Sequence, residues 1–412
     1  MWASLFKTFL TRYVTVTNCS LQPTKRLDFV FFDAGGGHRS AANALKAVIQ
    51  QQGRPWEIRL VNLQEILDPL DIFRKYTRIR MQDVYNVMLQ KGWTLGSAQM
   101  TVLMHGLIRL YHGGQVRLLT EFWKQGERDL VVSLIPNFNR ALRQSLPATP
   151  LVTLLTDFAD YPPHFWIERQ DQYLICGTEK AVEQARALGH PKEHIFATSG
   201  MILRPSFYEP VTADRAAERR RIGLDPELPT GLVLFGGQGS SVMPEIARRV
   251  TAIPDFNAQF IFICGRNKKL AQRLRSMPTK FPKYVEEFTS EIPYYMHLSD
   301  FFIGKPGPGS ISEAIAMRLP VVVERNAWTL PQERYNTEWI REKQVGVVLP
   351  SFREIDAGLR ELLDPDNFSR FRANAAAITN RAVFEIPEIL ETLLQPERRP
   401  VQSLLPPEKA AN

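Results

Sequence analysis

Residues 27–42, LDFVFFDAGGGHRSAA, contain the clearest indication of architecture in this chain. The mostly apolar run over 28–32 predicts a buried strand, and the glycines that follow it predict a tight turn. Apolar side chains then recur at helical spacing over 40–50, and residues 56–63 predict a second strand. A strand, a glycine turn, a helix and a second strand are the opening of a doubly wound parallel sheet, so the predicted fold class is α/β.

The same pattern begins again in the second half of the chain. Residues 231–235 predict an apolar strand, the turn GGQG follows at 236–239, and residues 243–250 predict a helix. Further strands are predicted at 130–135, 151–156, 173–176, 259–264, 284–288, 301–303 and 321–323. We therefore expect two similar domains, at 1–208 and 209–383, joined near 206–212. A terminal helix at 384–395 and a disordered, proline-rich tail at 396–412 complete the prediction.

Composition limits the class of protein. The chain has 412 residues, 44% hydrophobic and 23% charged, which is ordinary for a globular protein and excludes a disordered or collagen-like chain. Its three cysteines are too few for a disulfide framework or a cysteine-based zinc site, which favours the cytoplasm. No apolar run approaches the roughly 20 residues of a transmembrane helix. Lys7 and Arg12 interrupt the amphipathic start, so we expect that segment to pack on the protein or lie on a membrane.

The net charge of +8 is concentrated in the segment 69–128, which holds nine Lys and Arg against four acids. Seven aromatic residues are interleaved with these charges, and Arg109 is the only charged residue over 94–111. Basic and aromatic residues beside an apolar helix are typical of a surface that binds anionic lipid headgroups, so we predict peripheral membrane association. The alternative is a helical insertion that packs on the sheet. Nucleic acid is not an expected partner, because no nucleic-acid-binding motif accompanies the charge.

The first glycine loop matches neither of two common phosphate-binding motifs. It lacks the lysine of a P-loop, and the second strand ends near Asn62 rather than at the acid that binds the ribose of NAD. His38 begins the following helix, where the positive end of the helix dipole favours a neutral imidazole that can accept a proton. The other interpretation is a tight turn with a solvated histidine.

A second loop, KPGPGS at 305–310, separates the strand at 301–303 from the next helix. Its glycines expose backbone N–H groups at a helix N-terminus, which is a natural site for a diphosphate. Glu313 lies in the first turn and can accept hydrogen bonds from both hydroxyls of a ribose attached to that diphosphate. Alternatively, Glu313 only complements the helix dipole.

Other polar segments follow strands of the second half. CGRN at 264–267 and the pair at 288–289 are candidates for framing a nucleobase, although core packing explains Phe288 equally well. PQERYN at 331–336 offers side chains that can bind sugar hydroxyls, whereas taken alone it is a solvated loop.

Seven motifs occur in the order of a known family: GGGHRSAA at 35–42, TDF at 156–158, TEKAVEQARALG at 178–189, RPSF at 204–207, FGGQGSSVMPEIARR at 235–249, ICGRNKKLA at 263–271 and KPGPGSISEA at 305–314. Together they resemble the monogalactosyldiacylglycerol synthases and related bacterial diacylglycerol glycosyltransferases of glycosyltransferase family 28, over residues 27–395. The resemblance implies a GT-B fold, with two Rossmann-like domains facing a central cleft. It also implies inverting transfer of a hexose from a UDP-sugar to a lipid acceptor of the diacylglycerol type.

The resemblance assigns roles to single residues. On the donor side it implies that Glu313 binds the ribose and that Arg266 and Phe288 lie on the uracil side. It also implies that the phosphates are bound by Gly307, Gly309 and Ser310, and the sugar by Gln332, Glu333 and Asn336. We also expect Thr289 beside the base and amides of Gly237, Gly239 and Ser240 beside the diphosphate. The acceptor side comprises Gly36, Gly37, Asp157 and His164, with His38, or Asp33 acting through it, as the catalytic base. No cofactor or metal is expected, because no Asp-x-Asp pair accompanies the diphosphate loop.

Two segments depart from the family pattern. Residues 159–163 separate Asp157 from His164, and Leu330-Pro331 stand where a glycine often precedes Gln332. Both segments fall at acceptor or sugar contacts, so the identities of the sugar and of the lipid stay open. Two other classes also stay open: a UDP-sugar epimerase, and a non-catalytic binder of UDP-sugars or lipids.

Overall fold

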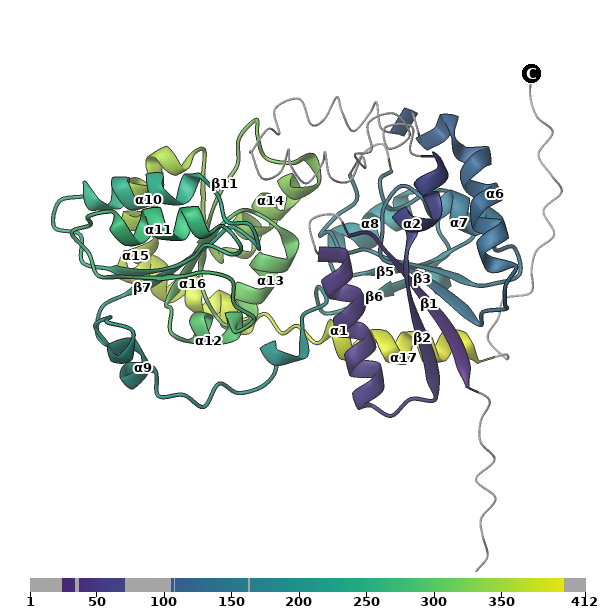
Figure 1. The fold of residues 1–412 in the computed structure, drawn as a ribbon, viewed down its shortest axis with the longest axis horizontal. Coiled ribbons are helices and arrows are strands. Elements are labelled where there is room, and N and C mark those ends of the chain that lie inside the picture. Colours follow the sequence, from purple (N-terminus) through teal and green to yellow (C-terminus); the bar gives the residue numbers. More distant parts are fainter. Residues whose placement is uncertain (1–23, 34–36, 71–104, 107, 162–163, 396–412) are drawn as a thin grey trace, which may run out of the picture.

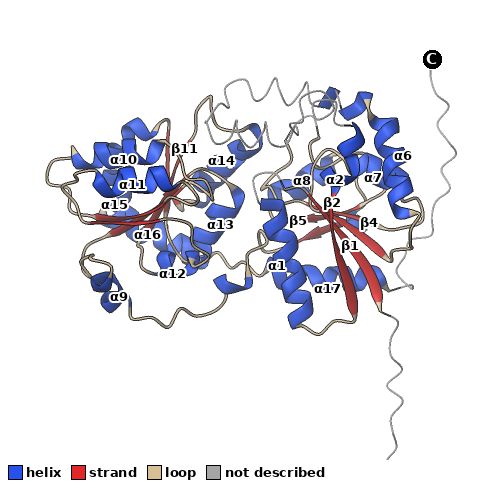
Figure 2. Cartoon of the chain, viewed as in Figure 1, coloured by secondary structure: helices blue, strands red, loops and turns tan. Residues whose placement is uncertain are grey.

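The computed structural model of the chain describes residues 24–33, 37–70, 105–106, 108–161 and 164–395. These residues form two α/β units that lie side by side, each built around one six-stranded sheet (Figure 1). All the paired strands of both sheets are parallel. Helices cover the sheets (Figure 2), and apolar clusters lie on both faces of each sheet. The predicted α/β class of doubly wound parallel sheets is confirmed.

The first sheet has the strand order β2-β1-β3-β4-β5-β6. Its strands are β1 (Lys25–Phe31), β2 (Trp56–Asn62), β3 (Leu130–Ser133), β4 (Leu151–Leu154), β5 (Tyr173–Cys176) and β6 (Ile195–Ala197). The helices of this unit are α1 (Gly37–Gln51), α2 (Leu63–Leu67), η1 (Asp68–Leu70), α6 (His112–Trp123), α7 (Asn139–Ser145), α8 (Glu179–Ala187) and η2 (Lys192–His194). Strands β3 and β4 are buried along their whole length, which is why they appear in the sequence as continuous apolar runs.

The second sheet has the order β12-β11-β10-β7-β8-β9. Its strands are β7 (Thr230–Leu234), β8 (Gln259–Ile263), β9 (Lys283–Glu286), β10 (Phe301–Gly304), β11 (Val321–Glu324) and β12 (Gly346–Leu349). The helices are η3 (Pro205–Phe207), α9 (Arg215–Arg221), α10 (Val242–Thr251), α11 (Lys268–Ser276), α12 (Ile292–His297), α13 (Pro308–Ala316), η4 (Pro331–Glu333), α14 (Arg334–Lys343), η5 (Phe352–Glu354), α15 (Ile355–Leu363) and α16 (Pro365–Ala377).

The last helix, α17 (Ala382–Leu394), returns to the first unit, where it lies beside α1 (Figure 1). Its buried residues Ala382, Ile386 and Leu390 belong to the same apolar cluster as Leu27 and Phe29 of β1. The terminal helix was predicted, but the sequence did not indicate which domain it covers.

The structure adds two strands that were not predicted, β6 and β12. Strand β6 (IFA) has three residues and is only partly buried, and β12 (GVVL) has four that alternate between half-buried and buried, so both are shorter or less buried than the central strands although their residues are apolar. The start of the chain, most of the basic segment 69–128 and the tail 396–412 lie outside the described residues. Within the described part of the basic segment, α6 packs on the first unit through Leu119 and Trp123. Among the described helices, none combines the length and apolarity needed to cross a bilayer.

Candidate active site

The strand orders determine where ligands can bind in each unit. In the second sheet the order reverses between β7 and β10, so the loops that leave these two neighbouring strands diverge to opposite faces. Open α/β sheets bind ligands outside the carboxyl ends of the strands at such a switch point. The two glycine loops of the second half, 236–240 after β7 and 305–310 after β10, therefore lie at this point. In the first sheet the corresponding point lies between β1 and β3 and contains the loop that leads to His38.

Helix α13 begins with an anion-binding arrangement. Gly307 is its N-cap residue, no side chain caps it, and Pro308 occupies the first turn. The backbone N–H groups of Gly309 and Ser310 belong to that first turn, where N–H groups have no intrahelical acceptor. Gly309 is exposed. These groups and the positive end of the helix dipole are suited to a diphosphate.

Glu313 was predicted in the first turn of this helix, but it lies one turn further along, because α13 already begins at Pro308. Its side chain is 22% exposed, and Oε1 is 3.9 Å from Nη2 of Arg204. Burial raises the pKa of Glu313 to about 7, and the positive charge of Arg204 opposes this shift. A carboxylate at this place can accept the two hydroxyl groups of a ribose whose phosphates sit on the helix N-terminus.

The loop after β7 approaches the end of β8 closely. Gly236 and Gly239 have φ of +78° and +63°, and a Cβ on Gly239 would lie 2.7 Å from the carbonyl oxygen of Cys264. The N–H of Arg266 donates to the carbonyl of Gly237 at 2.9 Å. Gly237 itself is exposed, and a Cβ there would meet nothing within 4 Å. Glycine is thus needed for the shape of this loop at Gly239, whereas Gly237 leaves open space for a ligand.

An exposed aromatic surface lies at the ends of β8 and β9. The guanidinium of Arg266 lies 4.7 Å from the ring centre of Phe288, and Phe288 is 55% exposed. Phe288 is therefore not a core residue, and its ring and Arg266 form a stacked pair that can contact a planar base. The hydroxyl of the next residue, Thr289, accepts a hydrogen bond from the N–H of Glu291 at 2.9 Å and shapes the turn into α12.

The residues predicted to bind the sugar occupy different environments. Gln332 is half-buried on η4, and Oε1 of Glu333 lies 3.3 Å from Nζ of Lys305. Asn336 has no exposed surface, and its Nδ2 donates to the carbonyl of Pro306 at 2.7 Å. Asn336 therefore has no exposed atom that could contact a sugar. Its hydrogen bond instead supports the 305–310 loop.

On the opposite side of the site, His38 is held between loops of the first unit. The hydroxyl of Thr156 lies 3.1 Å from Nδ1, and the ring centre lies 5.9 Å from that of Trp166. Burial lowers the pKa of His38 to about 4, against a weaker opposite effect of a hydrogen bond with the main chain of Leu134. The imidazole is therefore neutral at pH 7, as a proton acceptor must be.

Two aspartates bind Trp166, the residue whose ring lies beside His38. Asp157 accepts a 2.8 Å hydrogen bond from Nε1 of Trp166, and Asp160 accepts one of 2.6 Å from the N–H of Trp166. His164 has φ of +60° and lies 3.9 Å from Asp160. Asp33 accepts a hydrogen bond from Arg39 at 2.9 Å. Of the predicted glycines, Gly37 is the first residue of α1, and Gly36 lies outside the described residues.

The two halves of the site face each other. Burial raises the pKa of Asp157 to about 7, and the charge of Glu333 in the second unit adds to the shift while that of Lys305 opposes it. The following residue, Phe158, packs edge-on against Trp339 of α14 with ring centres 4.9 Å apart. The structure thus brings the predicted acceptor side and the predicted sugar loop together across the junction between the units.

Three contributors were not singled out in the sequence. Trp166 is fully buried and donates hydrogen bonds to the carboxylates of both Asp157 and Asp160. A lone tryptophan in a loop forms no sequence pattern that would predict this role. Thr156 contacts His38, although its motif TDF suggested only the aspartate. The pairing of Arg204 with Glu313 joins residues 109 positions apart and has no local signal.

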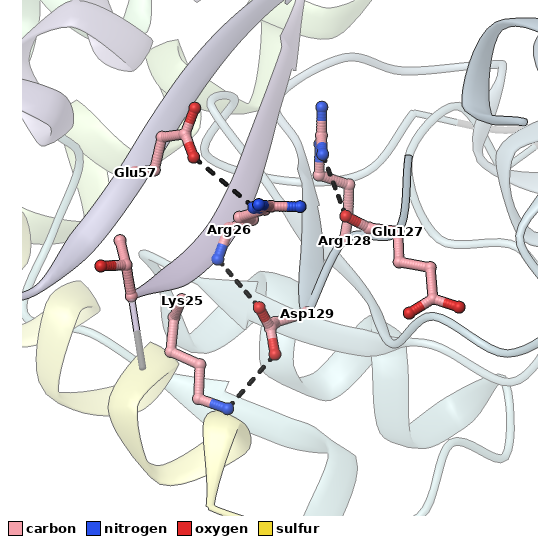
Figure 3. A pocket seen from close by; sticks show the side chains of 7 residues that line it. Lys25, Arg26, Glu57, Glu127, Arg128 and Asp129 are labelled. Atoms are coloured by element: carbon pink, nitrogen blue, oxygen red, sulfur yellow. Dashed lines mark hydrogen bonds and ion pairs between the residues drawn. The ribbon is translucent and has the colours of Figure 1, made fainter. Parts of the chain in front are cut away.

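A cavity of about 600 Å³ lies at the other edge of the first sheet, where the strands begin. Lys25 and the main chain of Arg26 bind Asp129 there, and the Arg26 side chain lies 3.7 Å from Glu57 (Figure 3). Because this cavity lies where the strands begin, at the opposite edge of the sheet from the switch point, it is not part of the site. Over the described ranges of the chain, no cluster of His, Cys, Asp and Glu side chains is arranged to hold a metal ion.

Solved structures show which class of fold this is. MurG of Acinetobacter baumannii matches with a TM-score of 0.56 at 10% identity, covering 90% of this chain and 100% of that one. The calicheamicin glycosyltransferase CalG4 matches with a TM-score of 0.58 at 16% identity, covering 90% of this chain and 99% of that one. A putative UDP-N-acetylglucosamine 2-epimerase from Listeria monocytogenes matches with a TM-score of 0.56 at 16% identity, covering 90% of this chain and 96% of that one. The protein has the GT-B fold of glycosyltransferases, as predicted, and the epimerase shows that this fold alone does not fix the reaction.

The curated relatives are more specific. The chain is 27% identical over 358 residues to monogalactosyldiacylglycerol synthase 1 of Arabidopsis thaliana, which covers 83% of this chain and 65% of that protein. It is 26% identical over 415 residues to the monogalactosyldiacylglycerol synthase of Spinacia oleracea, covering 93% and 75%. The chain thus spans less than two thirds of the Arabidopsis relative's length. The resemblance that the motifs indicate is confirmed, while no family model matches the chain.

Proposed function

We propose that the protein is an inverting glycosyltransferase that moves a hexose from a UDP-sugar to a lipid acceptor of the diacylglycerol type. The observation that carries the proposal is the start of α13, where the uncapped N–H groups at Gly309 and Ser310 precede Glu313 by one turn. This arrangement suits a diphosphate and the ribose attached to it. The similarity to monogalactosyldiacylglycerol synthases along most of the chain supports the lipid acceptor and a hexose donor.

In this reaction the acceptor hydroxyl attacks the anomeric carbon, the bond from that carbon to the β-phosphate oxygen breaks, and UDP leaves. The hydroxyl proton goes to a base, which we assign to His38 because its imidazole is neutral and borders the acceptor side. Negative charge grows on the leaving diphosphate. The N–H groups of α13 and of the loop 236–240, with the ammonium of Lys305 nearby, stabilise that charge without a metal ion.

We also propose that the enzyme works at an anionic membrane surface. The support is the excess of basic over acidic residues in the segment 69–128, together with its aromatic residues. Sedimentation with phosphatidylglycerol vesicles should exceed sedimentation with phosphatidylcholine vesicles and should fall as salt is added. Equal sedimentation with both would contradict this part of the proposal.

The decisive experiment supplies diacylglycerol vesicles and, in turn, UDP-galactose, UDP-glucose and UDP-N-acetylglucosamine. We expect a hexosylated diacylglycerol in the lipid fraction by mass spectrometry, and an equal amount of UDP, with one of these donors. His38→Ala serves as the matched control and should form little product. An epimerised sugar without a lipid product would instead identify an epimerase, and donor binding without any turnover would identify a non-catalytic binder.

A further inference from the structure

Arg204 lies on the segment that joins the two sheets, between the end of β6 and the start of β7. It precedes η3, whose Phe207 is buried in the apolar cluster of the second unit together with Leu224 and Leu232. The guanidinium stacks 5.3 Å from the ring centre of Phe207, and Nη1 donates to the carbonyl of Ser290 at 3.3 Å. Two contacts to the second unit therefore hold this arginine in place.

The same guanidinium lies 3.9 Å from the carboxylate of Glu313. Among the described residues, no hydrogen bond reaches that carboxylate, and Arg204 is the charge that acts on its pKa. Helix α13 carries no second charged residue. The other charged residues on α13 and the elements packed against it, or within two residues of their ends, are Asp300, Lys305, Arg318, Glu324, Arg325, Asp364, Asp366, Arg370 and Arg372.

We propose that Arg204 is a positioning residue that keeps the Glu313 carboxylate ionised and directed at the ribose. The inference rests on the function proposed above, because it requires Glu313 to bind a ribose. A carboxylate that accepts two hydroxyl groups must be ionised, since its protonated form loses part of its acceptor capacity. Burial favours the protonated form of Glu313, and a fixed guanidinium at this distance favours the charged form. The segment between the sheets thereby contributes to nucleotide binding.

The test is calorimetric titration with UDP-glucose from about pH 6 to about pH 8.5, a range in which the phosphates of this ligand keep a constant charge. Wild-type affinity should fall as the pH drops through the Glu313 pKa of about 7. In Arg204→Gln this midpoint should move up by about one pH unit, so that binding is about fivefold weaker at pH 7 and nearly tenfold weaker at pH 6, and recovers at high pH. Arg204→Lys keeps the charge and should restore most of the wild-type profile.

Two further titrations separate the possible failures. Glu313→Gln should abolish this pH dependence, and if it binds like the wild type the ribose assignment of the proposed function is wrong. The positioning role is wrong if Glu313→Gln behaves as expected but Arg204→Gln binds UDP-glucose more weakly by the same factor at every pH. It is also wrong if Arg204→Gln binds UDP-glucose as tightly as the wild type. Arg204→Gln should also lose less with 2′-deoxy-UDP-glucose, which lacks one of the two hydroxyl groups. The exposed Arg273→Gln on α11 is the control and should bind like the wild type.

Discussion

Replacing Asn336 with alanine is expected to weaken the binding of UDP itself, because Asn336 supports the loop 305–310, which we propose binds the diphosphate. Its Nδ2 donates to the carbonyl of Pro306 at 2.7 Å, and Pro306 directly precedes Gly307, the N-cap of α13. The asparagine is completely buried, so neither water nor another side chain can readily replace the lost donor. The loop should therefore shift at the point where it presents its N–H groups.

The size of the effect follows from the contacts that are lost. Leaving a buried carbonyl without its donor costs about 1–3 kcal/mol of unfolding free energy. For a unit of this size, that lowers Tm by about 2–4 °C per kcal/mol. If the shifted loop also loses one charge-assisted hydrogen bond to the diphosphate, the Kd for UDP rises about 10- to 100-fold.

The assay is calorimetry with UDP and with UDP-glucose on the same variant. If Asn336 contacted the sugar directly, as the family resemblance implies, UDP would bind normally and only UDP-glucose would bind more weakly. Unchanged UDP affinity in Asn336→Ala would therefore refute the supporting role. Asn374→Ala is the matched control, because Asn374 also donates from its amide to a main-chain carbonyl, that of Gln344 at 2.9 Å, away from the site.

Three further predictions concern chemistry and pH. His38→Ala should lower kcat by about 10²- to 10⁴-fold and leave the Kd for UDP-glucose unchanged; unchanged kcat in steady-state assays would remove His38 as the base. The pKa of Asp157 is about 7 in the folded protein against an ordinary value of 3.8, so the folded state keeps a proton over that interval. The free energy of unfolding should therefore fall as pH rises from about 4 to about 7, and the Tm of Asp157→Asn should fall less than that of the wild type over this range. Parallel plots of Tm against pH for the two proteins would contradict this prediction. Excess EDTA should leave glycosyl transfer unchanged, whereas a loss that Mg²⁺ restores would show that a metal takes part.

Much of the architecture was predictable because parallel strands covered on both faces are short, continuous apolar runs. The strands β3, β4, β5, β7 and β8 were all predicted on that basis, within a residue or two at their ends. Strand β6 was not predicted; it has three residues, lies at the sheet edge and is only partly buried. The loops that carry Gly307 and His38 were also found, since polar and glycine residues that interrupt such runs mark strand ends.

The sequence by itself determined the doubly wound class, the two glycine loops at strand ends, the placement of His38 at a helix start and that of Glu313 in the helix after the second loop, because local pattern and backbone geometry govern these features. Only the tertiary structure decided which of these residues meet. The approach of Arg204 to Glu313, the burial of Asn336 behind the loop and the return of α17 to the first sheet all join segments distant along the chain. Contacts of this kind depend on how whole elements pack, and neither periodicity nor spacing encodes them locally.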